Sequence, residues 1–265
     1  MRPPPAAHLA ELRRLSDSVH RAAGATRDAV TVDGFSLYLS PDAAHPYMSL
    51  AVPEDVERDE WATALAALPA AFAARGRSAR IEIFAELHPT LLRAADAAGW
   101  RRAMTAPVMT LVPEAMTAAP SPVAAFRWLA PDEPARTVAA LWGAHVAYGG
   151  AEDDPAALDW RPQLERGLRR GTLLAGAADV DGVPRAGGVV QLGGDAGELA
   201  GVWTHPAYRR RGLARQVCHA LLTGTFARAV PLAWLSAAEG ALDLYESLGF
   251  VRVGTQVNLE PPSQP

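Results

Sequence analysis

Residues 205–214 have the sequence His205-Pro206-Ala207-Tyr208-Arg209-Arg210-Arg211-Gly212-Leu213-Ala214, which we expect to join a strand to a helix. The residues before it, 198–204, are mostly apolar, and after it Leu213, Val217 and Leu221 recur at the spacing of one helical face. Arginine side chains and the unpaired N–H groups of a helix start are groups with which proteins hold phosphate. Gly212 has no Cβ to keep an anion away from the backbone. The loop therefore predicts a phosphate site.

A second pattern follows at residues 240–250, which have the sequence Gly240-Ala241-Leu242-Asp243-Leu244-Tyr245-Glu246-Ser247-Leu248-Gly249-Phe250. Leu244, Tyr245 and Leu248 share one face of a helix, so we expect Tyr245 to point inward. Gly249 suits the C′ position that ends a helix, and Phe250 suits the hydrophobic contact that accompanies such an end.

These two segments together resemble the GNAT family of acyl-CoA-dependent N-acyltransferases. The family's acetyl-CoA loop, Gln/Arg-x-x-Gly-x-Gly/Ala, is matched by Arg209-x-x-Gly212-x-Ala214 at a strand-to-helix junction. The family's later helix often ends Leu-Tyr-x-x-Leu-Gly-Phe, as residues 244–250 do. Each match is weak alone, whereas their order and spacing make the pair specific.

The resemblance implies acetyl-CoA as the co-substrate and no metal. It places the pyrophosphate on the helix start and the pantetheine arm along the strand that ends at Thr204, with an N–H near Val202 facing the thioester oxygen. The cofactor-binding residues implied in this way are Val202, Thr204, Arg209, Arg210, Arg211, Gly212, Leu213 and Ala214. Without the second pattern, the loop alone would favour a solvated basic turn.

Two residues are the candidates for catalysis. By resemblance, Tyr245 protonates the departing thiolate and Glu198 acts as the base for the amine, directly or through water. The alternatives are a Tyr245 that only fills the core and a Glu198 that is a solvated strand residue. Ala238 departs from the family, which often has Asn there in contact with the cofactor.

The acceptor pocket is implied to lie near His145 and the acidic group Glu152-Asp153-Asp154. Those carboxylates are equally placed to cap the helix that begins at Pro155, and we favour capping. We interpret His145 as a packed or half-exposed helix residue rather than a base.

The two halves of the chain show a worn repeat. Leu92 stands seven residues before Gly99, as Leu242 stands seven before Gly249, so Ala95 takes the place of Tyr245. Where the second half has Arg209–Arg211, the first has Glu57-Arg58-Asp59-Glu60, whose carboxylates would repel a pyrophosphate. The first half also lacks the equivalent of the first strand and one helix of the second.

We therefore predict an α/β (α+β) protein of two GNAT-like domains, each a mixed, largely antiparallel sheet flanked by helices. The predicted domains are a degenerate one over 1–115 with no cofactor site, a linker over 116–124, a catalytic one over 125–260 and a disordered tail over 261–265. The expected strands are 34–39, 47–52, 79–84, 104–111, 126–129, 172–179, 186–192, 198–204, 232–236 and 251–259. The expected helices are 8–23, 59–75, 89–98, 135–148, with Asp132 as its N-cap, 156–170, 213–221 and 240–248.

Composition limits the partners. The chain has 265 residues and a net charge of −4, so no overall field attracts nucleic acid or an anionic membrane. It has one cysteine, no run of apolar residues long enough to span a membrane and no signal peptide, and we expect a cytoplasmic protein. The oligomeric state stays open between monomer and homodimer.

The leading hypothesis is transfer of an acetyl group to a primary amine, on a small molecule or a peptide, by direct attack through a tetrahedral intermediate. The alternative is a non-catalytic acyl-CoA-binding or scaffold protein. Nucleic-acid binding through Arg209–Arg215 is disfavoured by the net charge and by the absence of aromatic residues among these arginines.

Overall fold

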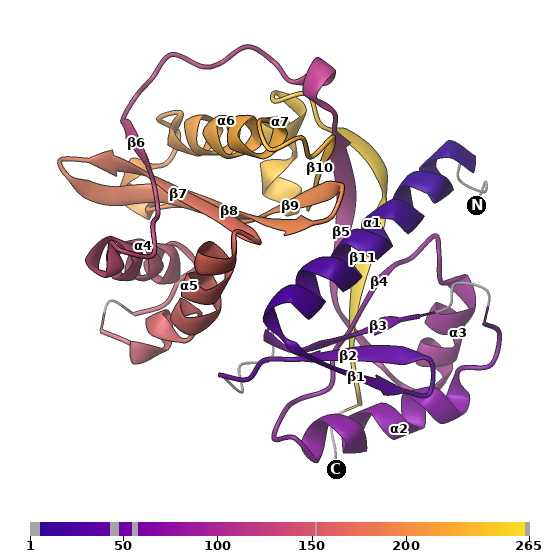
Figure 1. The fold of residues 1–265 in the computed structure, drawn as a ribbon. Helices are drawn as coiled ribbons and strands as arrows, with labels where there is room; N and C mark the ends of the chain where they lie inside the picture. The colour runs from indigo at the N-terminus through magenta and orange to yellow at the C-terminus, as the bar shows by residue number, and fades with distance from the viewer. Residues whose placement is uncertain (1–5, 43–47, 55–57, 152, 263–265) are drawn as a thin grey trace. The chain divides into compact units, whose positions relative to one another are not determined.

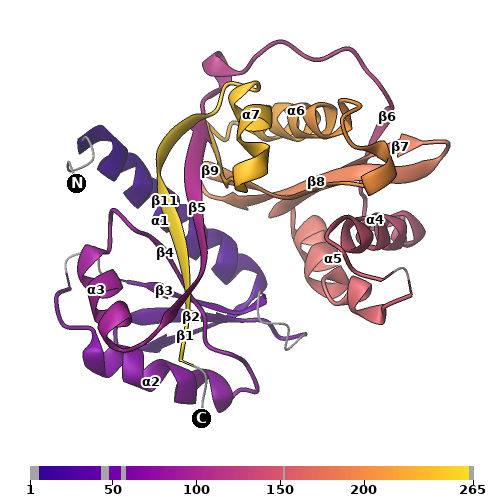
Figure 2. The same cartoon turned by 180° about the vertical axis from the view of Figure 1, so that it is seen from behind.

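The computed structural model describes residues 6–42, 48–54, 58–151 and 153–262 (Figures 1 and 2). Tyr47, Glu57, Glu152 and the tail residues 263–265, which the sequence expectations include, lie outside this range. Contacts divide the chain into a first unit, Met1–Met109 with Ser236–Glu239 and Arg252–Pro265, and a second unit, Thr110–Leu235 with Gly240–Val251. The units are therefore interleaved in sequence. The functional boundaries at 115 and 125 stay a prediction.

The first unit is a sheet in the order β1-β2-β3-β4-β11-β5, in which β3 and β4 run parallel and the pairs β1/β2, β2/β3 and β4/β11 run antiparallel. Its α1 lies on one face of the sheet and α2 and α3 on the other (Figure 1). The elements are α1 (Ala6–Thr26), β1 (Asp28–Val32), β2 (Phe35–Leu39), β3 (Leu50–Pro53), α2 (Ala62–Ala73), β4 (Ile81–Phe84), α3 (Pro89–Ala97), β5 (Arg101–Leu111) and β11 (Val251–Glu260).

The second unit is a sheet in the order β6-β7-β8-β9-β10, antiparallel except for the parallel pair β9/β10. Helices α4 and α5 cover one face and α6 and α7 the other (Figure 1). The elements are β6 (Ala125–Trp128), α4 (Pro134–Ala147), α5 (Arg161–Arg170), β7 (Leu173–Val180), β8 (Val183–Gly193), β9 (Ala196–Thr204), α6 (Leu213–Phe226), β10 (Leu232–Ser236) and α7 (Leu242–Glu246), with short 3-10 turns at Pro113–Ala115, Pro155–Leu158, Pro206–Tyr208 and Glu239–Ala241. The mixed α/β class and the mostly antiparallel, helix-flanked sheet agree with the prediction.

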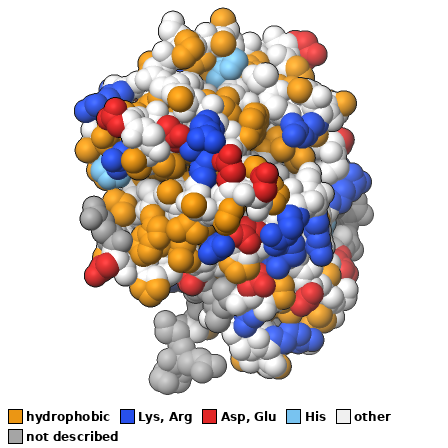
Figure 3. Space-filling view, turned by 60° about the vertical axis from the view of Figure 1, so that its left-hand side comes forward, with side chains coloured by type: hydrophobic (Ala, Val, Ile, Leu, Met, Phe, Trp, Pro, Cys, Tyr) orange, Lys and Arg blue, Asp and Glu red, His pale blue; other side chains and the backbone are white. Residues whose placement is uncertain are grey.

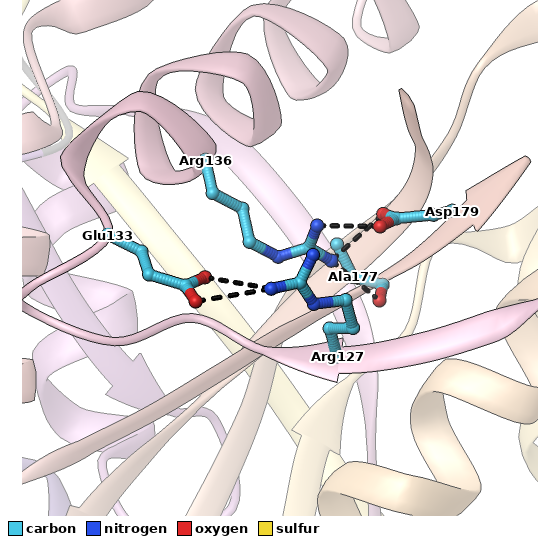
Figure 4. Close-up of polar contacts among 5 residues, drawn as sticks. All are labelled: Arg127, Glu133, Arg136, Ala177 and Asp179. Carbon is cyan, nitrogen blue, oxygen red and sulfur yellow. Dashed lines mark hydrogen bonds and ion pairs between the residues drawn. The ribbon is translucent and has the colours of Figure 1, made fainter. Parts of the chain in front are cut away.

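A buried ion pair fixes α4 to the sheet (Figure 4). The guanidinium of Arg136 forms two hydrogen bonds to the carboxylate of Asp179 on β7, at 2.6 and 2.9 Å, and both side chains are less than a tenth exposed. Trp203 of β9 holds the same helix from the sheet side, because a Cβ on Gly143 of α4 would lie 2.5 Å from its ring. The end of α4 therefore has a defined place above β9.

The elements depart from the sequence expectations at a few places. The strand β1 is missing from the expectations because its residues are mostly exposed, as at a sheet edge, and give little apolar alternation. The chain enters α4 at Glu133 rather than Asp132, and Glu133 pairs with Arg127 instead of capping the helix (Figure 4). The expected helix over 156–170 is a 3-10 turn followed by α5, which ends at the left-handed Gly171.

The segment before β6 is fastened to the second unit. Thr117 donates from its hydroxyl to the Ser247 carbonyl at 3.0 Å and from its N–H to the Leu248 carbonyl at 3.2 Å. Further along, the amide oxygen of Gln216 on α6 accepts from the N–H groups of Val123 and Ala124 at 2.9 and 3.2 Å. The segment predicted as a linker thus lies against α6 and α7.

Candidate active site

Strand β9 is bulged and has a free edge. Gly187 and Val189 of β8 pair with Trp203 and Ala200, so that two residues of β9, Gly201 and Val202, stand opposite one of β8. Gly201 has a φ of +55°, which a glycine adopts without strain. On the other side, β10 pairs with β9 only from Ala196 to Glu198. From Leu199 to Thr204, that edge of β9 has no strand partner in the described chain.

The loop after β9 is held by stacked side chains. The ring of Tyr208 contacts two guanidinium groups, those of Arg185 and Arg211, which lie 4.9 and 5.0 Å from its centroid. The N–H of His205 donates to the Arg185 carbonyl at 2.8 Å. Two cation–π contacts to one ring and a backbone hydrogen bond to β8 give the loop a fixed shape.

The start of α6 presents a row of backbone donors. Gly212, at a φ of +81°, is the N-cap residue, and Arg210 is also left-handed at +60°. From Arg210 onward, the first N–H group that donates to a backbone carbonyl is that of Gln216, which bonds the Gly212 carbonyl at 3.1 Å. Within the described residues, the N–H groups from Arg210 to Arg215 have no acceptor. Such a cluster at a helix N-terminus suits an anion.

The arginine side chains of this loop have different surroundings. Arg209 donates to the Thr204 carbonyl at 3.3 Å and to the Ala147 carbonyl at 2.9 Å. Arg211 donates to the Ala207 carbonyl at 3.1 Å besides covering Tyr208. Arg210 is exposed and makes no hydrogen bond or ion pair with the described residues. The predicted pyrophosphate residues thus gather at one helix start, with Arg210 free and Arg209 engaged by the chain itself.

Tyr245 points into the second unit, as predicted, and is 8% exposed. Its ring meets Phe250 edge-on at 5.9 Å between centroids. Its hydroxyl forms no hydrogen bond with any described residue. Burial raises the pKa of Tyr245, and the neighbouring Cys218 and Tyr148 raise it further, so the phenol keeps its proton at neutral pH. Tyr245 is therefore a proton donor without a fixed partner.

Glu198 lies on β9 at the last residue that pairs with β10, where it stands opposite Trp234. Its carboxylate accepts from the side-chain amide of Gln191 on β8 at 3.3 Å. The side chain is half-buried. Glu198 thus stands at the point where β9 and β10 separate, at the opposite end of the free edge from the α6 start.

The end of α4 lies beside this edge. The hydroxyl of Tyr148, which follows α4, donates to the Val202 carbonyl at 3.0 Å. Nε2 of His145 lies 3.4 Å from a carboxylate oxygen of Asp154. Asp154 caps the turn at Pro155 by accepting from the Ala156 N–H at 2.9 Å, which confirms the capping role predicted for it.

Comparison with known proteins decides the family. Residues 124–250 match the family model described as "Acetyltransferase (GNAT) family". This part of the chain belongs to the GNAT acetyltransferase family. The GNAT stretch contains β9, the loop, α6 and Tyr245, so the two sequence motifs and the family model agree. No curated protein matches the chain.

Solved structures extend the likeness to the whole chain. A GCN5-related N-acetyltransferase from Kribbella flavida is 23% identical, covers 96% of both chains and has a TM-score of 0.75. A putative GNAT-family acetyltransferase from Novosphingobium aromaticivorans is 19% identical over 93% of this chain and 96% of its own, with a TM-score of 0.58. A tandem GNAT protein from the clavulanic acid biosynthesis pathway is 17% identical over 87% of this chain and 79% of its own, with a TM-score of 0.59. At these identities the likeness shows the fold, and the first half shares it.

The described residues contain neither a group of metal ligands nor a helix suited to span a membrane. Within them, no three His, Cys, Asp or Glu side chains are grouped as metal ligands. None of their helices combines the length and the apolar character needed to cross a membrane.

Sequence reasoning missed several residues of this site. Tyr148 and its contact with Val202 join positions far apart in the chain and have no local signal. One of the two cation–π contacts of Tyr208 comes from Arg185, which lies on the strand β8. Gly201 could have been found, because a lone glycine within a strand pattern is a known sign of a bulge.

Proposed function

We propose that the chain is an acetyl-CoA-dependent N-acetyltransferase that acts on a primary amine. The observation that carries the proposal is the presence of three features in the second unit: the free edge of β9, the unpaired N–H groups of the α6 start, and the unbonded hydroxyl of Tyr245. An extended arm with amide groups suits a strand edge, and a pyrophosphate suits the helix start. Acetyl-CoA carries both, joined end to end, together with an activated acyl group as its thioester.

The residues that bind the co-substrate follow from their positions. The main chain of Val202 and Thr204 pairs with the arm. The N–H groups from Arg210 to Ala214, including those of Gly212 and Leu213, hold the pyrophosphate, and the Arg210 side chain adds its charge. Gly212 matters through its left-handed backbone, which a larger residue would strain, while a Cβ there would meet only Val123, at 3.8 Å.

The chemistry divides among three groups. Glu198 takes the proton of the incoming ammonium, directly or through water, so that the amine nitrogen attacks the thioester carbon. The N–H of Val202 donates to the oxygen on which negative charge develops, an effect worth up to a few kcal/mol when the donor is fixed beforehand. Tyr245 gives its proton to the sulfur as the carbon–sulfur bond breaks, and the phenolate regains a proton from the nitrogen of the new amide, directly or through water. Its raised pKa fits this role because the phenol is fully protonated before the reaction.

The test is CoA release with a panel of primary amines, including amino acids, aminoglycosides and peptides with free N-termini. The chain contains no lysine, so acetylation of its own lysines gives no background. We expect release with at least one amine to exceed the rate without acceptor. Tight acetyl-CoA binding without release from any amine would favour the binding or scaffold protein.

A further inference from the structure

The free edge of β9 has two carbonyl groups that the chain itself occupies. The Val202 carbonyl accepts from the Tyr148 hydroxyl at 3.0 Å, and the Thr204 carbonyl accepts from Nε of Arg209 at 3.3 Å. These residues are the two whose main chain is proposed above to pair with the pantetheine arm. Backbone carbonyls need partners, and here side chains supply them in place of a neighbouring strand.

Tyr148 is held in this place mainly by its hydroxyl. It is 66% exposed, so little buried apolar surface fixes the ring. It follows the last residue of α4, and the next residue, Gly149, has open space around its Cα. Exposed side chains change rotamer within nanoseconds, so Tyr148 can leave Val202 without disturbing the core.

The same region is tied a second time through Arg209. Its Nη2 donates to the carbonyl of Ala147, the residue before Tyr148, at 2.9 Å. This hydrogen bond holds the end of α4 next to β9. Tyr148 also lies near enough to Tyr245 to influence its ionisation. The Tyr148 side chain therefore stands beside the place where the thioester end of the arm would lie.

We propose that the Tyr148 hydroxyl occupies the position at the Val202 carbonyl that an amide N–H of the pantetheine arm takes when acetyl-CoA binds. Tyr148 is then an internal competitor that lowers the affinity for the arm and leaves the nucleotide half of the co-substrate unaffected. This inference rests on the proposed function.

The experiment compares the parent chain with Tyr148→Phe by calorimetric titration. The ligands are acetyl-CoA and adenosine 3′-phosphate 5′-diphosphate, which carries the nucleotide half of coenzyme A without the arm. Tyr38→Phe is the control, because it also removes one hydrogen-bonded tyrosine hydroxyl, which lies 2.8 Å from Nδ1 of His20, on β2 of the first unit. Circular dichroism checks that every variant is folded.

We expect Tyr148→Phe to bind acetyl-CoA about threefold to tenfold more tightly than the parent, the range for loss of one competing neutral hydrogen bond. The nucleotide should bind both proteins equally, and Tyr38→Phe should match the parent with both ligands. Acetyl-CoA binding by the variant alone would support the same conclusion.

Three results would overturn the inference. Equal or weaker acetyl-CoA binding by Tyr148→Phe would show that the hydroxyl does not compete. A similar gain with the nucleotide would show an effect away from Val202. Failure of every folded variant to bind acetyl-CoA would remove the proposed function as well, so the two failures can be told apart.

Discussion

The ends of α3 and α7 share one pattern of backbone hydrogen bonds and carry different side chains, Ala95 and Tyr245, at the same position of that pattern. In α7 the N–H of Phe250 donates to the Tyr245 carbonyl at 3.1 Å, and the N–H of Gly249 donates to the Glu246 carbonyl at 3.0 Å. In α3 the N–H groups of Trp100 and Gly99 donate in the same pattern, to Ala95 at 2.9 Å and Asp96 at 3.2 Å. Both are Schellman ends with a left-handed glycine.

The shared bonds place Ala95 of the first half where Tyr245 stands in the second. Ala95 is fully buried and has no polar group, whereas Tyr245 brings a protonated phenol to the same position. The helix end is thus kept by capping and packing, which do not depend on the residue that carries the chemistry.

The starts of α2 and α6 differ in the same way. The N-cap of α2 is Trp61, and the guanidinium before it, that of Arg58, is paired with Asp33 at 3.0 Å and covers the Trp61 ring. The N-cap of α6 is Gly212, after exposed arginines. Side chains of its own unit cover the start of α2, whereas the start of α6 is exposed and accessible to an anion.

The largest expected effect is that of Tyr245→Phe on turnover. Removing a proton donor costs about a hundredfold or more, while the ring still fills the core, so acetyl-CoA affinity and the melting temperature should stay near those of the parent. Steady-state kinetics with an amine found in the panel, beside calorimetry, makes the comparison. Unchanged turnover would make Tyr245 a packing residue like Ala95.

The glycines of the two helix ends should differ in their tolerance of a side chain. A Cβ on Gly249 would overlap the carbonyl of Ala115, whereas one on Gly99 would meet only Pro262 at 3.9 Å. Gly99→Ala bears only the left-handed strain, about 1 kcal/mol, and Gly249→Ala should cost about 2–4 kcal/mol because the backbone must also shift. Guanidinium unfolding measures both. Equal losses of unfolding free energy in the two variants would mean that the segment around Ala115 shifts at little cost.

A smaller effect concerns Cys218 of α6, the chain's one cysteine. Burial raises its pKa to about 12 from a usual value of 9.0. The folded chain therefore holds this proton more tightly than the unfolded chain, so the stabilisation is complete below about pH 9 and is lost as the pH rises toward 12. Between these limits the free energy of unfolding should fall by about 1.4 kcal/mol per pH unit from this group.

Cys218→Ala tests this dependence, since alanine does not ionise. Its unfolding free energy, measured from pH 8.5 to pH 10.5, should fall less steeply than that of the parent. The raised pKa of Tyr245 also makes the free energy of unfolding fall with pH, but only above the usual tyrosine pKa of 10.0. Tyr245 therefore does not affect the lower part of this pH range. Parallel slopes would show that the Cys218 thiol ionises as easily in the folded chain as in the unfolded one.

Local signals explain what the sequence predicted well. The glycine and phenylalanine at the end of α7 and the glycine at the start of α6 act through bonds to residues a few positions away, so their spacing alone indicates the structure. The inward position of Tyr245 followed from helical periodicity in the same way.

Contacts between distant residues explain the rest. The partners of Arg209 are Thr204, close in sequence, and Ala147, which only the fold brings near. The charge of Arg209 was enough to predict a pyrophosphate role. Its hydrogen bonds to the two carbonyl groups could be seen only in the structure. Strand β1 was missed although the turn Asp33-Gly34, with φ values of +44° and +81°, is a hairpin signal.

The central claim is that the open start of α6 binds the phosphates of acetyl-CoA. The most direct measurement is calorimetric titration of acetyl-CoA into the parent, Gly212→Asp and the control Gly76→Asp. Gly76 is also an exposed left-handed glycine, at a φ of +64°, and a Cβ there has open space. We expect binding by the parent and the control and none by Gly212→Asp, whose carboxylate repels the pyrophosphate. Equal binding by all three folded proteins would contradict it.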